Sequence, residues 1–228
     1  MILNMAAGYQ TLGANVLFMT LESDSLNTQM RLMSRAFGIA HEDLINNEIT
    51  DSIKRKIKEY NLNPSSRIGI ATMSYRSSLA SILNYITIRA IVRPFNVLMI
   101  DPLDLIENGA ESTSKTASIA ATTIRKLRVL GAEYGFSTVV TTSINKTAAE
   151  KFRISSTVAS DVECGSSQVA MQADNIFILR QMPDNKLEVS GVKLRYTAEA
   201  KPVLMKIIPE QHKLVTITPD FEFAPVGK

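Results

Sequence analysis

The sequence predicts an α/β fold that begins with alternating strands and helices around a mainly parallel sheet and ends in antiparallel strands. Two apolar runs, VLFMTL at residues 16–21 and FNVLMI at 95–100, have the unbroken hydrophobicity of strands buried on both faces, as in a parallel sheet. Stretches with helical spacing of apolar residues lie between these runs. After residue 174 the chain instead reads as consecutive strands with no helix between them.

The elements of the first half follow from spacing and from helix start and stop signals. Apolar residues recur at helical spacing after the first strand, and Gly38 can end that helix in a left-handed conformation. The predicted elements are strands at 16–21 and 67–71 and helices at 25–37, within 41–60 (two short polar ones) and at 78–92.

The second half contains one more strand–helix unit, a long loop and the antiparallel finish. The loop over 145–173 is rich in Ser, Thr, Ala and charge, and loops of this length inside compact domains are usually functional. The predicted elements are a helix at 119–134 closed by Gly135 and strands at 95–100, 137–142, 175–182, 186–194, 202–208 and 213–218. We expect one domain over 1–228, with an α/β core at 1–144, the loop at 145–173 and a β-rich part at 174–228.

Composition excludes several classes of protein. Lys and Arg number 25 and Asp and Glu 22, and a net charge of +3 is too small for a tail that coats nucleic acid. A hydrophobic content of 45% supplies a core, which excludes disorder for most of the chain. The lone Cys164 cannot form an internal disulfide, and no apolar stretch is long enough to cross a bilayer. We therefore expect a cytoplasmic protein without a membrane partner.

Two apolar strands each deliver an acid at the carboxyl end, Glu22 after the first and Asp101 after the second. Ligands of open parallel sheets bind beyond the carboxyl ends of the strands, where one carboxylate can hold magnesium through water and the other can activate a water molecule. A third strand ends in Thr141, Thr142 and Ser143, with Asn145 close behind. The alternative is that each acid only caps the following helix, which for either acid alone is the better interpretation.

In order along the chain, these segments resemble the hexameric replicative DNA helicases of the DnaB class, most closely those of T-even-type phages. The segments that carry the resemblance are AAGYQTLGANVLFMTLESDSLNTQMR, NVLMIDPLDLI, TVVTTSIN, DVECGSSQVAMQADNIFIL and VKLRY. The resemblance covers nearly the whole chain and implies a RecA-like three-layer fold. It also implies an ATP- and Mg²⁺-dependent motor that works as a hexameric ring on single-stranded DNA, with a primase and a helicase loader as partners.

The resemblance assigns roles to individual residues. Glu22 matches the catalytic base, Asp101 the aspartate associated with the metal, and Arg31 the helix arginine of the nucleotide site. Asn145, or Ser143, matches the residue that senses the terminal phosphate. The last two matches are Lys193 and Arg195, which correspond to the basic pair that reaches the nucleotide of a neighbouring subunit.

The long loop matches the DNA-facing loop of the family. The resemblance places Glu163 and Gly165 in that loop. Lys146, Lys151 and Arg153 lie in the same segment and would face the channel of a ring, although scattered basic residues in a loop are equally well explained as solvated surface.

The phosphate-binding loop of the family has no counterpart here. The register places its Lys about three residues before Met1, so residues 1–9 match the helix after the loop, and no Gly-Lys-Ser/Thr occurs elsewhere in the sequence. We expect a motor domain without its first strand and Walker A loop, inactive alone, whose loop a separate chain could carry. The alternatives are a non-hydrolysing RecA-like interaction module and a recombinase-type filament protein.

Overall fold

The computed structural model describes residues 1–62, 68–74, 77–106, 116–143, 171–196 and 201–217. The helices are α1 (Ile2–Thr11), α2 (Ser25–Phe37), α3 (His41–Ile45), α4 (Asp51–Leu62), α5 (Leu79–Val92) and α6 (Thr116–Tyr134), with short 3-10 turns η1 (Leu103–Leu105) and η2 (Pro209–Gln211). The strands are β1 (Val16–Thr20), β2 (Ile68–Thr72), β3 (Val97–Asp101), β4 (Ser137–Val140), β5 (Asn175–Met182), β6 (Lys186–Leu194), β7 (Val203–Ile208) and β8 (Lys213–Thr216).

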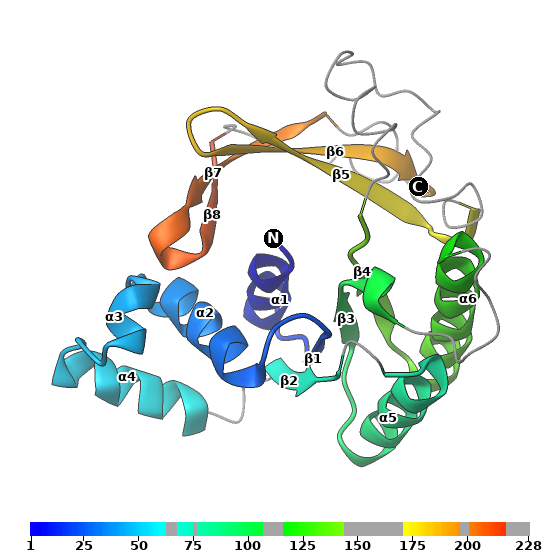
Figure 1. Cartoon of the computed structure of the whole chain (residues 1–228), viewed down its shortest axis with the longest axis horizontal. Helices are drawn as coiled ribbons and strands as arrows, with labels where there is room; N and C mark the ends of the chain where they lie inside the picture. The colour runs from blue at the N-terminus through cyan, green and yellow to red at the C-terminus, as the bar shows by residue number, and fades with distance from the viewer. Residues whose placement is uncertain (63–67, 75–76, 107–115, 144–170, 197–200, 218–228) are drawn as a thin grey trace.

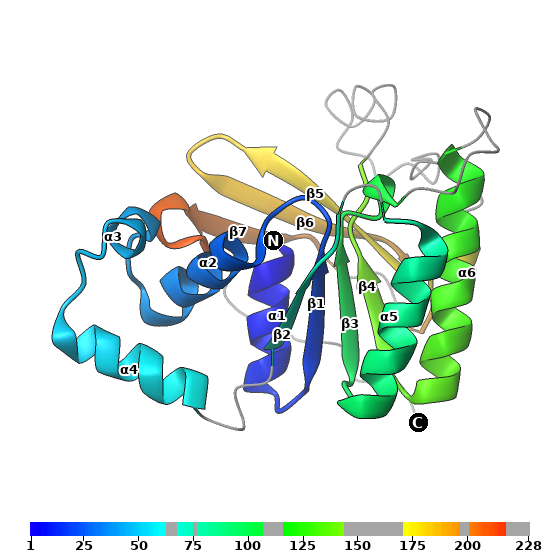
Figure 2. The same ribbon diagram turned by 60° about the horizontal axis from the view of Figure 1, so that its bottom comes forward.

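The central sheet has the order β2-β1-β3-β4 and all its neighbouring strands are parallel (Figure 2). β1 lies directly beside β3, with Thr20 paired to Asp101. The carboxyl ends of the strands that precede Glu22 and Asp101 therefore meet at one edge of the sheet. The predicted parallel sheet is confirmed.

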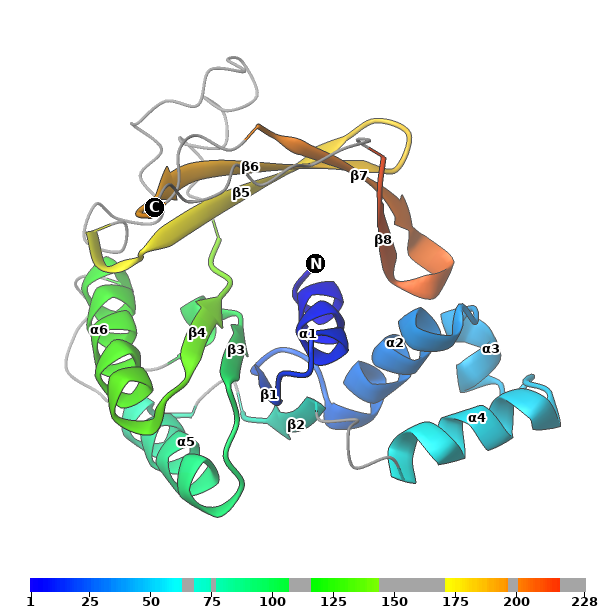
Figure 3. The same cartoon turned by 180° about the vertical axis from the view of Figure 1, so that it is seen from behind.

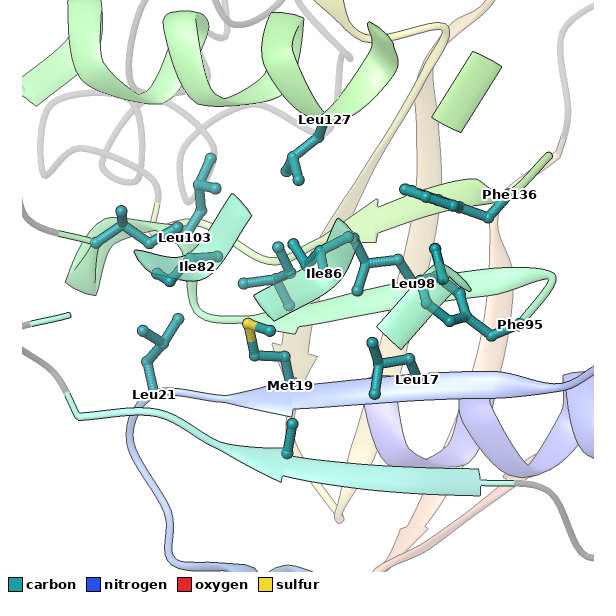
Figure 4. Packing of buried hydrophobic residues seen from close by; sticks show 14 of the residues in the cluster. Leu17, Met19, Leu21, Ile82, Ile86, Phe95, Leu98, Leu103, Leu127 and Phe136 are labelled. Carbon is teal, nitrogen blue, oxygen red and sulfur yellow. The ribbon is translucent and has the colours of Figure 1, made fainter. Parts of the chain in front are cut away.

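Both faces of this sheet are covered, which explains why its strands are unbroken apolar runs. All five residues of β1 are buried. On one face Leu17, Met19 and Leu98 pack against α5 and α6, as Figure 4 shows. On the other face Val16 and Phe18 pack against α1. The three-layer α/β arrangement is confirmed.

The C-terminal strands form a second sheet of their own, with the order β5-β6-β7-β8 and antiparallel neighbours. This sheet arches over α1 on the side opposite to α5 and α6, and its β7–β8 end descends beside α2 and α3 (Figures 1 and 3). The predicted antiparallel finish is confirmed, and tertiary packing separates it from the parallel sheet.

Local sequence signals set the ends of the helices close to their predicted positions. Asp24 caps α2 by accepting a hydrogen bond from the backbone N–H of Asn27 at 2.8 Å, and Gly38 ends the helix with a φ of 66°. Ser78 caps α5 in the same way, with 3.2 Å between its hydroxyl and the N–H of Ser81. The last helix, α6, begins at Thr116, earlier than the predicted residue 119.

Candidate functional site

The candidate site lies at the carboxyl edge of the central sheet, where β1, β3 and β4 end. Asp101 is the last residue of β3, and its carbonyl accepts a hydrogen bond from the backbone N–H of Leu21 at 3.0 Å. That bond extends the pairing of the two strands by one residue. Glu22, the next residue, is exposed just beyond this last bond. The structure thus brings the backbone positions of both predicted acids to the same edge.

The carboxylate of Asp101 is held by the neighbouring strand. The Thr141 hydroxyl donates to Asp101 Oδ1 at 2.5 Å, and the Asp101 side chain is half-buried. A hydroxyl that occupies one carboxylate oxygen fixes the rotamer and leaves the second oxygen for another donor, such as a metal-bound water.

Asp104 is a member of this edge that the sequence analysis missed. The Thr142 hydroxyl donates to its Oδ1 and the backbone N–H of Ser143 to its Oδ2, both at 2.6 Å. These bonds tie the segment after β4 to the turn after β3. Asp104 therefore holds Ser143, one of the two predicted phosphate sensors, close to the end of the Asp101 strand. A signal was present in the sequence, because IDPLDL offers two acids within four residues after an apolar strand.

Helix α1 begins at the same edge. Burial lowers the pKa of the Met1 α-amino group, and the negative charge of Asp101 opposes that shift, so the start of the helix lies near the Asp101 carboxylate. The amino end of a helix presents unpaired N–H groups and a partial positive charge, which favour anions such as phosphates.

Arg31 projects from α2 toward the same region rather than into solvent. Its Nε is buried without a hydrogen-bond partner in the described part of the chain. Its charge also acts on His212, whose pKa is lowered by burial first, then by His41 and Arg31. An unsatisfied buried guanidinium N–H is the feature expected of a residue that awaits an anionic ligand.

The basic pair lies in a separate cluster at the start of β5. Lys193 Nζ donates to the carbonyl of Ala173 at 2.7 Å, and the Arg195 guanidinium is paired with Asp174. Arg128 of α6 also contacts Asp174, at 3.3 Å. Both basic residues therefore face one segment, although β6 ends at Leu194 and only Lys193 belongs to the strand. No contact among the described residues joins them to Glu22 or Asp101.

The remaining predicted site residues lie outside the described residues. They are the sensor candidate Asn145 and the loop residues Lys146, Lys151, Arg153, Glu163 and Gly165. Across the described ranges, no group of three or more His, Cys, Asp or Glu side chains gathers as metal ligands, and no helix has the length and hydropathy to cross a membrane.

The comparisons with known proteins assign the family. The model of the DnaB-like helicase C-terminal domain matches residues 1–206, and the chain belongs to that family. No curated protein matches the sequence.

Solved structures share the fold at low sequence identity. An ATPase domain has a TM-score of 0.77 at 18% identity and covers 95% of this chain and 79% of its own. A DnaB-like replicative helicase, solved in a study of its interactions with primase, has a TM-score of 0.74 at 19% identity over 94% of this chain and 53% of its own. A KaiC-like protein from Pyrococcus horikoshii has a TM-score of 0.58 at 19% identity, over 92% of this chain and 79% of its own.

The described residues fit the metal and terminal-phosphate part of a magnesium nucleotide. Mg²⁺ is usually held by one or two carboxylates with water and substrate phosphates, so a single oriented Asp101 is sufficient and a cluster of acids is not required. The start of α1 and the unpartnered Arg31 N–H supply positive charge for phosphates. The Gly-rich cradle is the one part of such a site that this sequence lacks.

Proposed function

We propose that this chain is the ATPase motor of a replicative DNA helicase, which couples hydrolysis of ATP to movement on single-stranded DNA and to unwinding. The observation that carries the proposal is the direct pairing of β1 with β3, which delivers Glu22 and Asp101 to one sheet edge beside the start of α1. Membership in the DnaB-like family supports it. The same membership favours a helicase over a recombinase-type filament protein.

In this proposal each residue at the edge has one task. Bound Mg²⁺ neutralises charge on the phosphates and polarises the bond that breaks. Asp101, oriented by Thr141, accepts hydrogen bonds from the metal's water shell. Glu22, exposed and without a printed partner in the described part of the chain, takes the proton of the attacking water. Ser143 or Asn145 contacts the terminal phosphate.

Lys193 and Arg195 act on the nucleotide of a neighbouring subunit, where positive charge stabilises the transition state. Within one chain the pair is held against Ala173 and Asp174, away from Glu22, which supports a role across an interface in a hexameric ring. We place Lys146, Lys151, Arg153, Glu163 and Gly165 on the DNA in the central channel. A primase and a loader act on the assembled ring in the cytoplasm.

The phosphate cradle must come from another segment or a separate chain, because the sequence contains no Gly-Lys-Ser/Thr. The test is therefore made in a reconstituted enzyme, in which a Gly-rich segment ending in Gly-Lys-Ser/Thr is supplied in front of the chain or as a second polypeptide. DNA-stimulated release of phosphate and unwinding of a forked duplex are the two readouts.

Glu22→Gln is the informative substitution in that enzyme. Loss of the general base should leave the affinity for ATP within about twofold and lower the turnover by about 100-fold or more. Glu48→Gln, at another exposed position, is the matched control and should leave both quantities unchanged. Near-normal turnover in Glu22→Gln would remove the base assignment.

A second candidate function, a non-hydrolysing interaction module, is favoured by the missing cradle alone. It predicts that the reconstituted enzyme hydrolyses no ATP, with or without DNA, while the chain still assembles with helicase subunits. Measured turnover in the reconstituted enzyme decides between the two.

A further inference from the structure

A second positively charged site lies at the opposite end of the central sheet from Glu22 and Asp101. A cavity of about 270 Å³ is lined at this end by the first residues of β1, by Gly69 of β2, and by Pro94 and Phe95 before β3. Because the strands are parallel, all their amino ends meet here and their carboxyl ends meet at the candidate nucleotide site. The cavity is thus separated from that site by the length of the strands.

Two arginines from the end of α5 provide the charge of the cavity. Arg89 lies in the last turn of the helix and Arg93 is its C-cap residue. No acidic side chain lines the cavity. A cation at a helix carboxyl end is favoured by the helix dipole, which explains the presence of one arginine but not the shape of the space around it.

Arg89 has no partner that would neutralise it. Its Nε is buried without a hydrogen bond, and no ion pair holds its guanidinium in the described part of the chain. A buried guanidinium N–H left unpaired is costly, and native structures usually satisfy such groups with a protein acceptor, a water or a ligand. The neighbouring protein groups leave this acceptor to a molecule from outside the chain.

Gly69 makes room for the guanidinium. A Cβ at Gly69 would lie 3.3 Å from Arg89 Nη2, which is closer than ordinary van der Waals contact. Glycine weakens a strand interior, and its use there often marks a close approach by another group. Here the approaching group is the planar fork of Arg89, which matches the oxygens of phosphate with two parallel hydrogen bonds.

We propose that Arg89 and Arg93 form a binding site for a phosphate group at the amino edge of the central sheet, distinct from the nucleotide site. Two positive charges without an acid nearby suit a phosphate better than a singly charged carboxylate. The cavity has room for several waters, and so for a phosphate together with the group that carries it. The phosphate is supplied either by a free anion, such as pyrophosphate, or by a phosphodiester of nucleic acid.

The experiment maps the protection of individual arginines in the full chain. Phenylglyoxal modifies accessible guanidinium groups, and mass spectrometry locates each modified residue. Inorganic phosphate, pyrophosphate and a thymidine oligonucleotide are added separately at constant ionic strength. We expect at least one of them to slow the modification of Arg89 and Arg93 about tenfold, while Arg55 on α4 reacts at its original rate.

The arm that protects identifies the source of the phosphate. Protection by pyrophosphate or phosphate indicates a free anion, and protection by the oligonucleotide alone indicates a phosphodiester. Equal rates in all arms, or equal protection of Arg55, would overturn the site.

Substitutions give an independent measure in the same chain. Arg89→Gln and the exposed Arg93→Gln should each weaken binding of the protecting anion about tenfold or more, and Arg55→Gln should leave it unchanged. Arg93→Gln keeps the test meaningful if Arg89→Gln fails to fold. The site is wrong if Arg93→Gln and Arg55→Gln bind the anion equally. Neither result depends on ATP turnover, so this site and the proposed motor function can fail separately.

Discussion

His212 joins an unusual backbone conformation to a contact between two rings. Its φ of 48° lies in the left-handed region, and its ring packs edge-on against His41 with 4.8 Å between the ring centroids. Burial, the His41 ring, the Arg31 guanidinium and the Met1 amine all lower the pKa of His212 below its ordinary value near 6.5. The charged form is therefore disfavoured in the folded state.

This shift predicts a dependence of stability on pH. Between the lowered folded pKa and the ordinary value the unfolded chain binds more protons, so the contribution of His212 is complete above about pH 6.5 and is lost as the pH falls below it. We expect the urea midpoint to decrease from about pH 7 to about pH 5. In His212→Asn, which tolerates the left-handed conformation, the decrease should be smaller. Identical slopes in the two proteins would show that His212 does not contribute.

At the scale of elements, two helical glycines differ in what surrounds them. A Cβ on Gly131 of α6 would lie 2.6 Å from the carbonyl oxygen of Phe136, because the chain turns back tightly there into β4. A Cβ on Gly8 of α1 would meet nothing within 4 Å. The first glycine is required by packing between a helix and the following turn, and the second is not.

These surroundings predict opposite effects for the same substitution. Gly131→Ala should lower the free energy of unfolding by about 1–3 kcal/mol, because a backbone carbonyl must move. Gly8→Ala should raise it by about 0.5–1 kcal/mol, because alanine loses less entropy in a helix. Urea unfolding monitored by circular dichroism measures both. A stabilised Gly131→Ala protein would contradict the packing of α6 against this turn.

At the scale of the whole molecule, Asn4 of α1 joins the two sheets. Its amide N–H donates to the His212 carbonyl at 2.9 Å, and its Oδ1 accepts from the Leu214 N–H at 3.0 Å and from Arg35 Nε at 2.8 Å. One side chain thus connects the β7–β8 end of the antiparallel sheet to the two helices α1 and α2. The antiparallel sheet is held above the candidate site partly by this contact.

Asn4→Ala should loosen that connection. We expect a loss of about 2 kcal/mol in the free energy of unfolding, since three hydrogen bonds disappear and partly buried groups remain unpaired. The Leu214 amide should exchange with solvent faster, while amides of β1 and β3 keep their protection. Gln29→Ala, at an exposed position of α2, is the control. Unchanged exchange at Leu214 would exclude the connecting role.

The sequence predicted the central sheet well because its strands are short, apolar and buried on both faces, as at 16–21 and 95–100. Caps such as Asp24 and Gly38 are local, and local signals can be located in a single sequence. The roles of Glu22, Asp101, Lys193 and Arg195 remain predictions.

The missed features depend on contacts between residues far apart in the chain. Asp104 supports Ser143 across 39 positions, and Arg89 is left unpaired beside Gly69 by the way α5 packs on the sheet. Neither residue carries a local signal for these contacts.

By itself, the sequence determined which segments become strands and helices and that two strands end in acids, because hydrophobic period and capping act over a few residues. Only the tertiary structure decided that β1 and β3 are neighbours, that the antiparallel strands form a separate sheet, and that two arginines enclose a cavity at the far edge. Those outcomes depend on how buried faces pack against one another, and packing is a property of the whole chain.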